Sequence, residues 1–158
     1  MFITELKRDF EVKQVEATAE TIDANVKVLM VVHTKNLADK TLYAIDQFLM
    51  RGGQLMVLVD PLSIMDSAPG MNPLQRTQSA SSSLDKLTKA WGMEFDANKV
   101  VADMNYKTTI NRGQGRPEVT QAFLSLTKEG LATNDVTTAQ IDSLLIPFGG
   151  ATIEHVDG

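Results

Sequence analysis

The chain has 158 residues, of which 43% are hydrophobic and 22% charged, and a formal net charge of −5. This length suits one globular domain with a genuine core, predicted over residues 1–158, and the acidic balance without a basic stripe argues against nucleic-acid binding. The chain has no cysteine, which excludes disulfides, thiol nucleophiles and cysteine-ligated metal sites. No stretch approaches the roughly 20 apolar residues that a membrane-spanning helix needs.

The N-terminal residues predict a helix followed by a strand. Ile3, Leu6 and Phe10 have helical spacing, which predicts a helix over residues 1–9. Residues 10–16 alternate apolar and polar side chains, as a half-buried strand does. An α/β domain usually begins with a strand, so a helix at residue 1 suggests that a segment upstream has been removed.

Residues 26–60 give the clearest prediction, a strand–helix–strand unit. The apolar runs at 26–32 and 54–59 are typical of strands covered on both faces. Between them, residues 36–51 carry an apolar stripe at helical spacing, with Asn36 as a possible N-cap. Short connections on both sides of a helix predict parallel strands. The fold expected on this basis is α/β with a mainly parallel sheet.

The glycine pair after the predicted helix marks the C-terminal end of that helix. Gly52 and Gly53 stand where a helix C-terminus prefers a left-handed residue. A phosphate would need the N-terminal end of a helix, and the chain has neither a Walker A motif nor a G-x-G-x-x-G motif. The pair therefore does not indicate a phosphate site.

The second half of the chain has weaker patterns. Ser82 is a possible N-cap for a helix that begins near Leu84 and stops at Gly92. Pro147 interrupts the last apolar run and suggests an edge strand or a strand end. Exposed edge strands would allow a sheet-continuing dimer as well as a monomer. The other predictions are an irregular loop at 61–83, short strands at 93–95 and 99–104, irregular sequence at 105–118, a short helix or extended surface segment within 117–130, and a strand within 142–150.

His33 and Asp60 are the candidate site residues. Each follows one strand of the predicted parallel pair, and ligands of open α/β sheets bind at that carboxyl edge. The pair could do acid–base work, hold a metal, or form a ligand or partner crevice. The alternative is that Asp60 only ends its strand and forms a turn with Pro61. We favour this structural role, because no nucleophile or second carboxylate accompanies the two residues at motif spacing.

Other chemistry finds little support in the sequence. His33 and His155 are far apart, and the chain has no H-E-x-x-H motif or calcium-loop spacing. The serines at 79–83 lack the G-x-S-x-G elbow of serine hydrolases. We therefore predict no catalytic residues, no metal and no cofactor.

Three stretches, taken in order, resemble a known family. The longest, "VLMVVHTKNLADKTLYAIDQFLMRGGQLMVLVDP" (28–61), has a strand ending in His, an L-Y-A-I-D-Q-F helix, an R-G-G end and a strand ending in D-P. The others are "LDKLTKAWGMEFDANKVVAD" (84–103) and "VTTAQIDSLLIP" (136–147). The chain thereby resembles the auxiliary extracytoplasmic component of gliding-motility-type ABC transport systems, an uncharacterised ABC-transporter accessory family.

The resemblance implies a fold, a place and partners. The fold would be a three-layer α/β sandwich, flavodoxin-like or glutamine-amidotransferase-like but without the catalytic cysteine. The module would act without catalysis on the outer (periplasmic) side of the cytoplasmic membrane, bound to ABC permease and ATPase subunits or to a substrate. Residues 1–158 would be a soluble module excised from a larger, membrane-anchored protein, and contact with the membrane would run through segments outside this chain. The alternatives are a small-molecule or sugar-binding domain that uses a crevice at His33 and Asp60, and a hydrolase.

Overall fold

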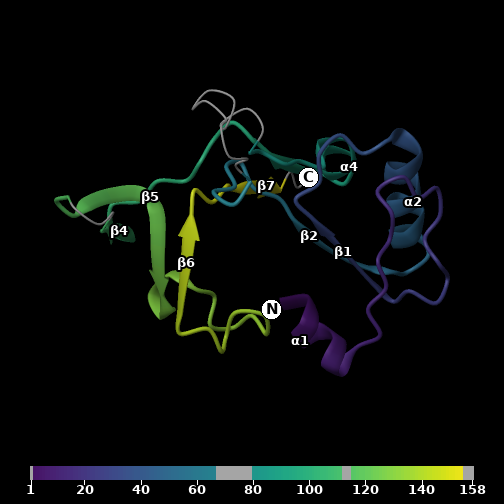
Figure 1. Cartoon of the computed structure of the whole chain (residues 1–158), viewed down its shortest axis with the longest axis horizontal. Coiled ribbons are helices and arrows are strands. Elements are labelled where there is room, and N and C mark those ends of the chain that lie inside the picture. Colours follow the sequence, from purple (N-terminus) through teal and green to yellow (C-terminus); the bar gives the residue numbers. More distant parts are fainter. Residues whose placement is uncertain (1, 67–79, 112–114, 155–158) are drawn as a thin grey trace. The chain divides into compact units, whose positions relative to one another are not determined.

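A computed structural model describes residues 2–66, 80–111 and 115–154. Contacts group the chain into two compact units, one formed by Met1–Val31 and Asn36–Val57, the other by Val32–Lys35 and Leu58–Gly158. Figure 1 shows the elements of both units. That residues 1–158 form a single excised domain stays a prediction.

The predicted strand–helix–strand unit is confirmed. It consists of β1 (Val28–Val32), α2 (Asp39–Met50) and β2 (Gln54–Leu58), and the two strands form a short parallel sheet. The first unit also contains the predicted N-terminal helix, α1 (Phe2–Asp9), none of whose described residues is buried. Residues 10–16 form no strand, so that prediction is wrong.

Helix α2 packs through one face and ends in a glycine motif. Leu42, Ile45 and the fully buried Phe48 lie on the face predicted from their spacing. Gly52 has a φ of +90° and donates its N–H to the Leu49 carbonyl at 2.9 Å, while Gly53 donates to Phe48 at 3.0 Å. These two bonds form a Schellman motif, which satisfies carbonyls at the helix end. The predicted role of the glycines in ending the helix is confirmed.

Two details of this unit differ from the prediction. The helix begins after Ala38, and Asn36 instead adopts a left-handed backbone with a φ of +48°. Strand β1 is also not covered on both faces, because Val28 and Val32 are exposed while Leu29 and Val31 are buried. A continuous apolar run therefore did not imply two covered faces.

The second unit is mainly antiparallel. Strand β3 (Met93–Phe95) pairs with β7 (Thr152–Glu154), and a three-stranded sheet has the order β4-β5-β6. The strands of that sheet are β4 (Lys107–Ile110), β5 (Glu118–Thr127) and β6 (Ser143–Pro147). The unit also contains α4 (Asp85–Ala90) and the 3-10 helix η1 (Lys128–Gly130).

The predicted fold class is therefore wrong. Over its described residues the chain is a mixed α/β protein with a two-stranded parallel sheet and two antiparallel sheets. The prediction was a flavodoxin-like or glutamine-amidotransferase-like three-layer sandwich on a mainly parallel sheet. The reason lies in the connections. A parallel pair needs a crossover of a dozen residues or more, whereas only residues 111–117 separate β4 from β5. Short connections of this kind favour antiparallel pairs.

Several local predictions in the second unit can also be compared with the structure. The strand at 93–95 and the edge strand that ends at Pro147 are confirmed, whereas 99–104 forms no strand and 105–118 contains β4. Residues 117–130 were predicted to form either a short helix or an extended segment. The structure shows the extended form, strand β5, followed by the 3-10 helix η1. Ser82 does not cap α4, whose N-cap position is Leu84. Most of the predicted loop at 61–83 lies outside the described residues.

Candidate functional site

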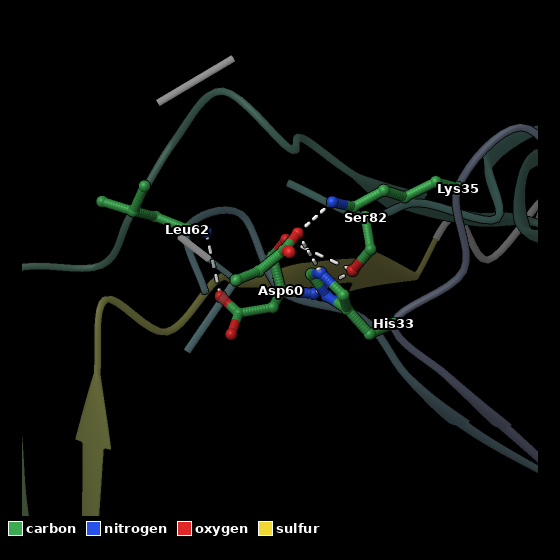
Figure 2. Close-up of polar contacts among 6 residues, drawn as sticks. His33, Lys35, Asp60, Leu62 and Ser82 are labelled. Atoms are coloured by element: carbon green, nitrogen blue, oxygen red, sulfur yellow. Dashed lines mark hydrogen bonds and ion pairs between the residues drawn. The ribbon is translucent and has the colours of Figure 1, made fainter. Parts of the chain in front are cut away.

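Asp60 lies in a turn that is fixed by hydrogen bonds on both sides. Its Oδ1 accepts the N–H of Leu62 at 2.9 Å, across Pro61, and forms a local carboxylate turn. Its own N–H donates to Ser82 Oγ at 2.8 Å, and its carbonyl accepts the Ser82 N–H at 2.8 Å (Figure 2). Ser82 is only 3% exposed. Asp60 thus joins the end of the β2 segment to the residues that precede α4.

His33 ends the β1 segment in a strained backbone conformation. Its φ of +48° lies in the left-handed region, which residues other than glycine rarely adopt. The His33 N–H donates to the Leu58 carbonyl at 2.8 Å, so the residue remains joined to the end of β2. The following residue, Thr34, exchanges hydrogen bonds of 3.3 Å with Ser83. The turn therefore directs the chain from the sheet edge to the segment that contains Ser82.

A cluster of three charged or titratable side chains forms at this edge. His33 Nε2 lies 3.1 Å from Asp66 Oδ2, and Lys35 Nζ forms an ion pair with the same oxygen. The three side chains are between 27% and 39% exposed. Hydrogen bonds from Lys35 and then from His33 lower the pKa of the Asp66 carboxyl below its usual value. We call these three residues the edge cluster.

The structure places His33 and Asp60 in the same part of the second unit but gives each its own partners (Figure 2). His33 contacts Asp66, and the Asp60 carboxylate contacts Leu62. Sequence reasoning singled out neither Lys35 nor Asp66 for this site. The sequence gives a weak indication for Lys35, because this residue lies two positions after His33, near the same strand end. It gives none for Asp66, which lies in a loop without periodicity.

The chemistry of the edge cluster is that of a partly exposed, ion-paired surface. It offers one carboxylate whose charge is stabilised by a cation and an imidazole, and it presents hydrogen-bonding atoms to solvent. Within the described ranges, no three His, Asp or Glu side chains are grouped so that they could hold a metal ion. Among the same residues, no helix has the length and hydropathy needed to cross a bilayer.

Comparison with known proteins gives one match. A family model described as an ABC-type uncharacterized transport system matches residues 1–156, which is nearly the whole chain. Neither the curated proteins nor the solved structures provide a match. The family model thus covers all three stretches on which the resemblance to an ABC-transporter accessory family was based. The chain belongs to this ABC-type transport family, as an auxiliary component of such a system.

Proposed function

We propose that the chain is a non-catalytic interaction module of a gliding-motility-type ABC transport system. In this proposal it lies on the extracytoplasmic, periplasmic face of the cytoplasmic membrane and binds the permease or ATPase assembly, or the transported substrate. The family match across residues 1–156 is the observation that carries the proposal. The edge cluster is the surface that we assign to the partner subunit.

The geometry of the edge cluster supports recognition of a partner. Lys35 and Asp66 are 37% and 39% exposed at their side chains, so a partner can reach both without unfolding the segment. Charged groups at the rim of an interface mainly set partner choice and the rate of association. Hydrogen bonds from His33 to Leu58 and between Thr34 and Ser83 hold the backbone of this segment, which lowers the entropy lost on binding.

The positions of the two predicted site residues support a role without catalysis. Asp60 holds a turn through Leu62, and His33 contacts a carboxylate that Lys35 already neutralises. A general base must instead have its proton-accepting atom directed at a substrate proton. The polar contacts of Asp60 and His33 are therefore those of groups that shape a surface.

The test is co-purification with the transport complex. The gene of the full protein is expressed with neighbouring ABC permease and ATPase genes, and the detergent-solubilised permease is captured by a tag. We expect the chain to be retained. Lys35→Ala should reduce retention at least several-fold, whereas Lys99→Ala, which removes an exposed lysine paired with Asp96 at 3.0 Å, should leave it unchanged. Equal retention of both variants would exclude the edge cluster as the contact.

Two further measurements separate the alternatives. A phosphatase reporter fused to the full protein after this module should be active, because the enzyme folds only outside the cytoplasm; an inactive reporter contradicts the periplasmic assignment. Calorimetric titration with sugars should show no binding. Saturable binding that is lost in both His33→Ala and Asp60→Ala would instead support the small-molecule-binding alternative.

A further inference from the structure

Strand β6 (Ser143–Pro147) forms one edge of the three-stranded sheet, and its free side carries hydrogen-bonding groups. Phe148 donates its N–H to the Ala122 carbonyl at 2.8 Å, and Leu124 pairs with Ile146 and Leu126 with Leu144. Hydrogen-bonded pairs alternate along an antiparallel ladder. The backbone groups of residues 144 and 146 therefore face β5, and those of 143 and 145 point away from the sheet.

The hydrogen bonds on the β4 side of β5 agree with this alternation of inward and outward backbone groups. Ser125 donates its N–H to the Tyr106 carbonyl at 2.7 Å, and Phe123 accepts from Thr108 Oγ1 at 2.7 Å. Odd-numbered residues of β5 thus face the β4 side and even-numbered residues face β6. Within the part of the chain that the structure describes, β5 is the only strand hydrogen-bonded to β6.

The two edges of this sheet differ in their protection against strand pairing. Strand β4 begins with a charged residue, Lys107, and its register shifts between Lys107 and Thr108. Lysines and bulges at an edge prevent another strand from adding to it. Strand β6 has no charge over residues 143–147, and Leu144 and Leu145 are 40% and 57% exposed. Only Pro147 limits pairing, and it stands at the end of the strand.

We infer that β6 pairs antiparallel with β6 of a second copy of this chain and continues the sheet across a two-fold axis. The strand is self-complementary in one register, with Ser143 opposite Leu145 of the second copy and Leu144 opposite its own symmetry mate. The outward N–H and C=O groups of residues 143 and 145 then form four intermolecular bonds. A register that pairs Leu145 with Leu145 of the second copy would place Ser143 opposite Pro147, which has no N–H to donate.

The side chains fit the same register. Leu144 lies beside Leu126 on the sheet face, and in the pair it meets Leu144 of the second copy at the close spacing of a non-hydrogen-bonded position. The two copies of Asp142 lie at opposite ends of the paired strands, and each is already paired with Lys128 at 2.7 Å. A short interface of this kind is small by the standards of permanent dimers, so the dimer is reversible and dissociates on dilution.

Sedimentation velocity over a wide concentration range tests the inference on the whole chain. We expect the weight-average mass to rise toward twice the monomer value as concentration increases. Leu145→Pro should remain monomeric while keeping its circular dichroism spectrum, because the N–H that it removes does not bond to β5. A control substitution on the other edge strand, Thr109→Lys, should dimerise like the unmodified chain. Unchanged dimerisation by a folded Leu145→Pro variant, or a monomer at every concentration, overturns the inference.

A crosslink tests the register itself. Because the chain has no cysteine, Leu144→Cys introduces a single thiol on the proposed two-fold axis. Mild oxidation should convert most of this variant into a disulfide-linked dimer, while Thr109→Cys should stay mainly monomeric. Equal crosslinking of the two variants contradicts the register. A monomeric chain whose β6 amide protons become protected only when another protein is added would assign the edge to that protein.

Discussion

The α2 helix connects strands β1 and β2, and the turn at Asp60 follows β2, but different forces hold the two regions. In the first, Phe48 is fully buried and a Cβ added at Gly53 would overlap its ring, so apolar packing fixes the chain. In the second, Ser82 is the buried hydroxyl, and hydrogen bonds to Asp60 fix the chain. The first region should therefore respond to lost side-chain volume, and the second to lost hydrogen-bond donors and acceptors.

The largest expected effect belongs to the packed region. Phe48→Ala should lower the free energy of unfolding by about 3–5 kcal/mol, because it removes a fully buried ring and leaves a cavity. Urea unfolding followed by circular dichroism measures the change. Tyr43→Ala on the same helix is the control, since Tyr43 is 64% exposed and should cost far less. Equal losses in the two variants would contradict the claim that packing holds this region.

Ser82→Ala tests the hydrogen-bonded region. The substitution removes the oxygen that accepts the Asp60 N–H at 2.8 Å and leaves that donor without its partner. An unpaired donor of this kind costs about 1–3 kcal/mol. Ser83→Ala is the matched control, because it keeps the backbone bonds that Ser83 exchanges with Thr34. The same urea unfolding should show the larger loss for Ser82→Ala.

Asp60→Ala should have a smaller effect, about 1 kcal/mol, typical of a lost turn or cap. Among the described residues, the carboxylate contact at stake is the 2.9 Å bond from the Leu62 N–H. Asp60→Asn retains an oxygen acceptor and should recover most of the stability. Partner binding should be nearly unchanged in both variants. Unchanged stability combined with abolished binding would reverse the structural role that we assign to Asp60.

The smallest effect is a pH dependence at the edge cluster. Lys35 and His33 lower the pKa of Asp66 in the folded chain, so the stabilisation is fully present above the usual aspartate pKa of about 3.9. It should disappear as the pH falls through the lowered value. Asp66→Asn should therefore be less stable than the unmodified chain at neutral pH and equally stable in strong acid. Lys35→Met removes the largest cause of the lowered Asp66 pKa and should reduce the stability difference that Asp66→Asn makes at neutral pH. A stability difference that persists in strong acid would contradict the prediction.

The sequence predicted the packed region well because its signals are local. The stripe through Leu42, Ile45 and Phe48 and the glycine pair lie within a dozen residues, and each has one structural interpretation. Long-range pairing was not predictable in the same way. Strand β3 pairs with β7, and Met93 lies opposite Glu154, some sixty residues away. Three-residue strands have too little periodicity to identify such a partner. The mainly parallel sheet was therefore inferred from the first region, and the flavodoxin-like or glutamine-amidotransferase-like class from the family resemblance.

The candidate site shows the same division between local and long-range signals. The positions of His33 and Asp60 at strand ends followed from the apolar runs before them. The partners Asp66 and Ser82 lie in an irregular stretch, where neither helical nor strand spacing predicts which side chain returns to the sheet edge. The contacts of Asp66 with His33 and Lys35 could therefore be identified only from the structure.

The left-handed backbone at His33 has a consequence for how this family's sequences vary. Glycine and asparagine adopt such a φ more readily than histidine, so either could replace His33 and keep the turn. Neither would carry the imidazole that contacts Asp66. The residue at position 33 thus meets two separate requirements, one on backbone shape and one on side-chain chemistry. Relatives that carry glycine or asparagine there should have lost the acid at position 66 more often than relatives that keep histidine.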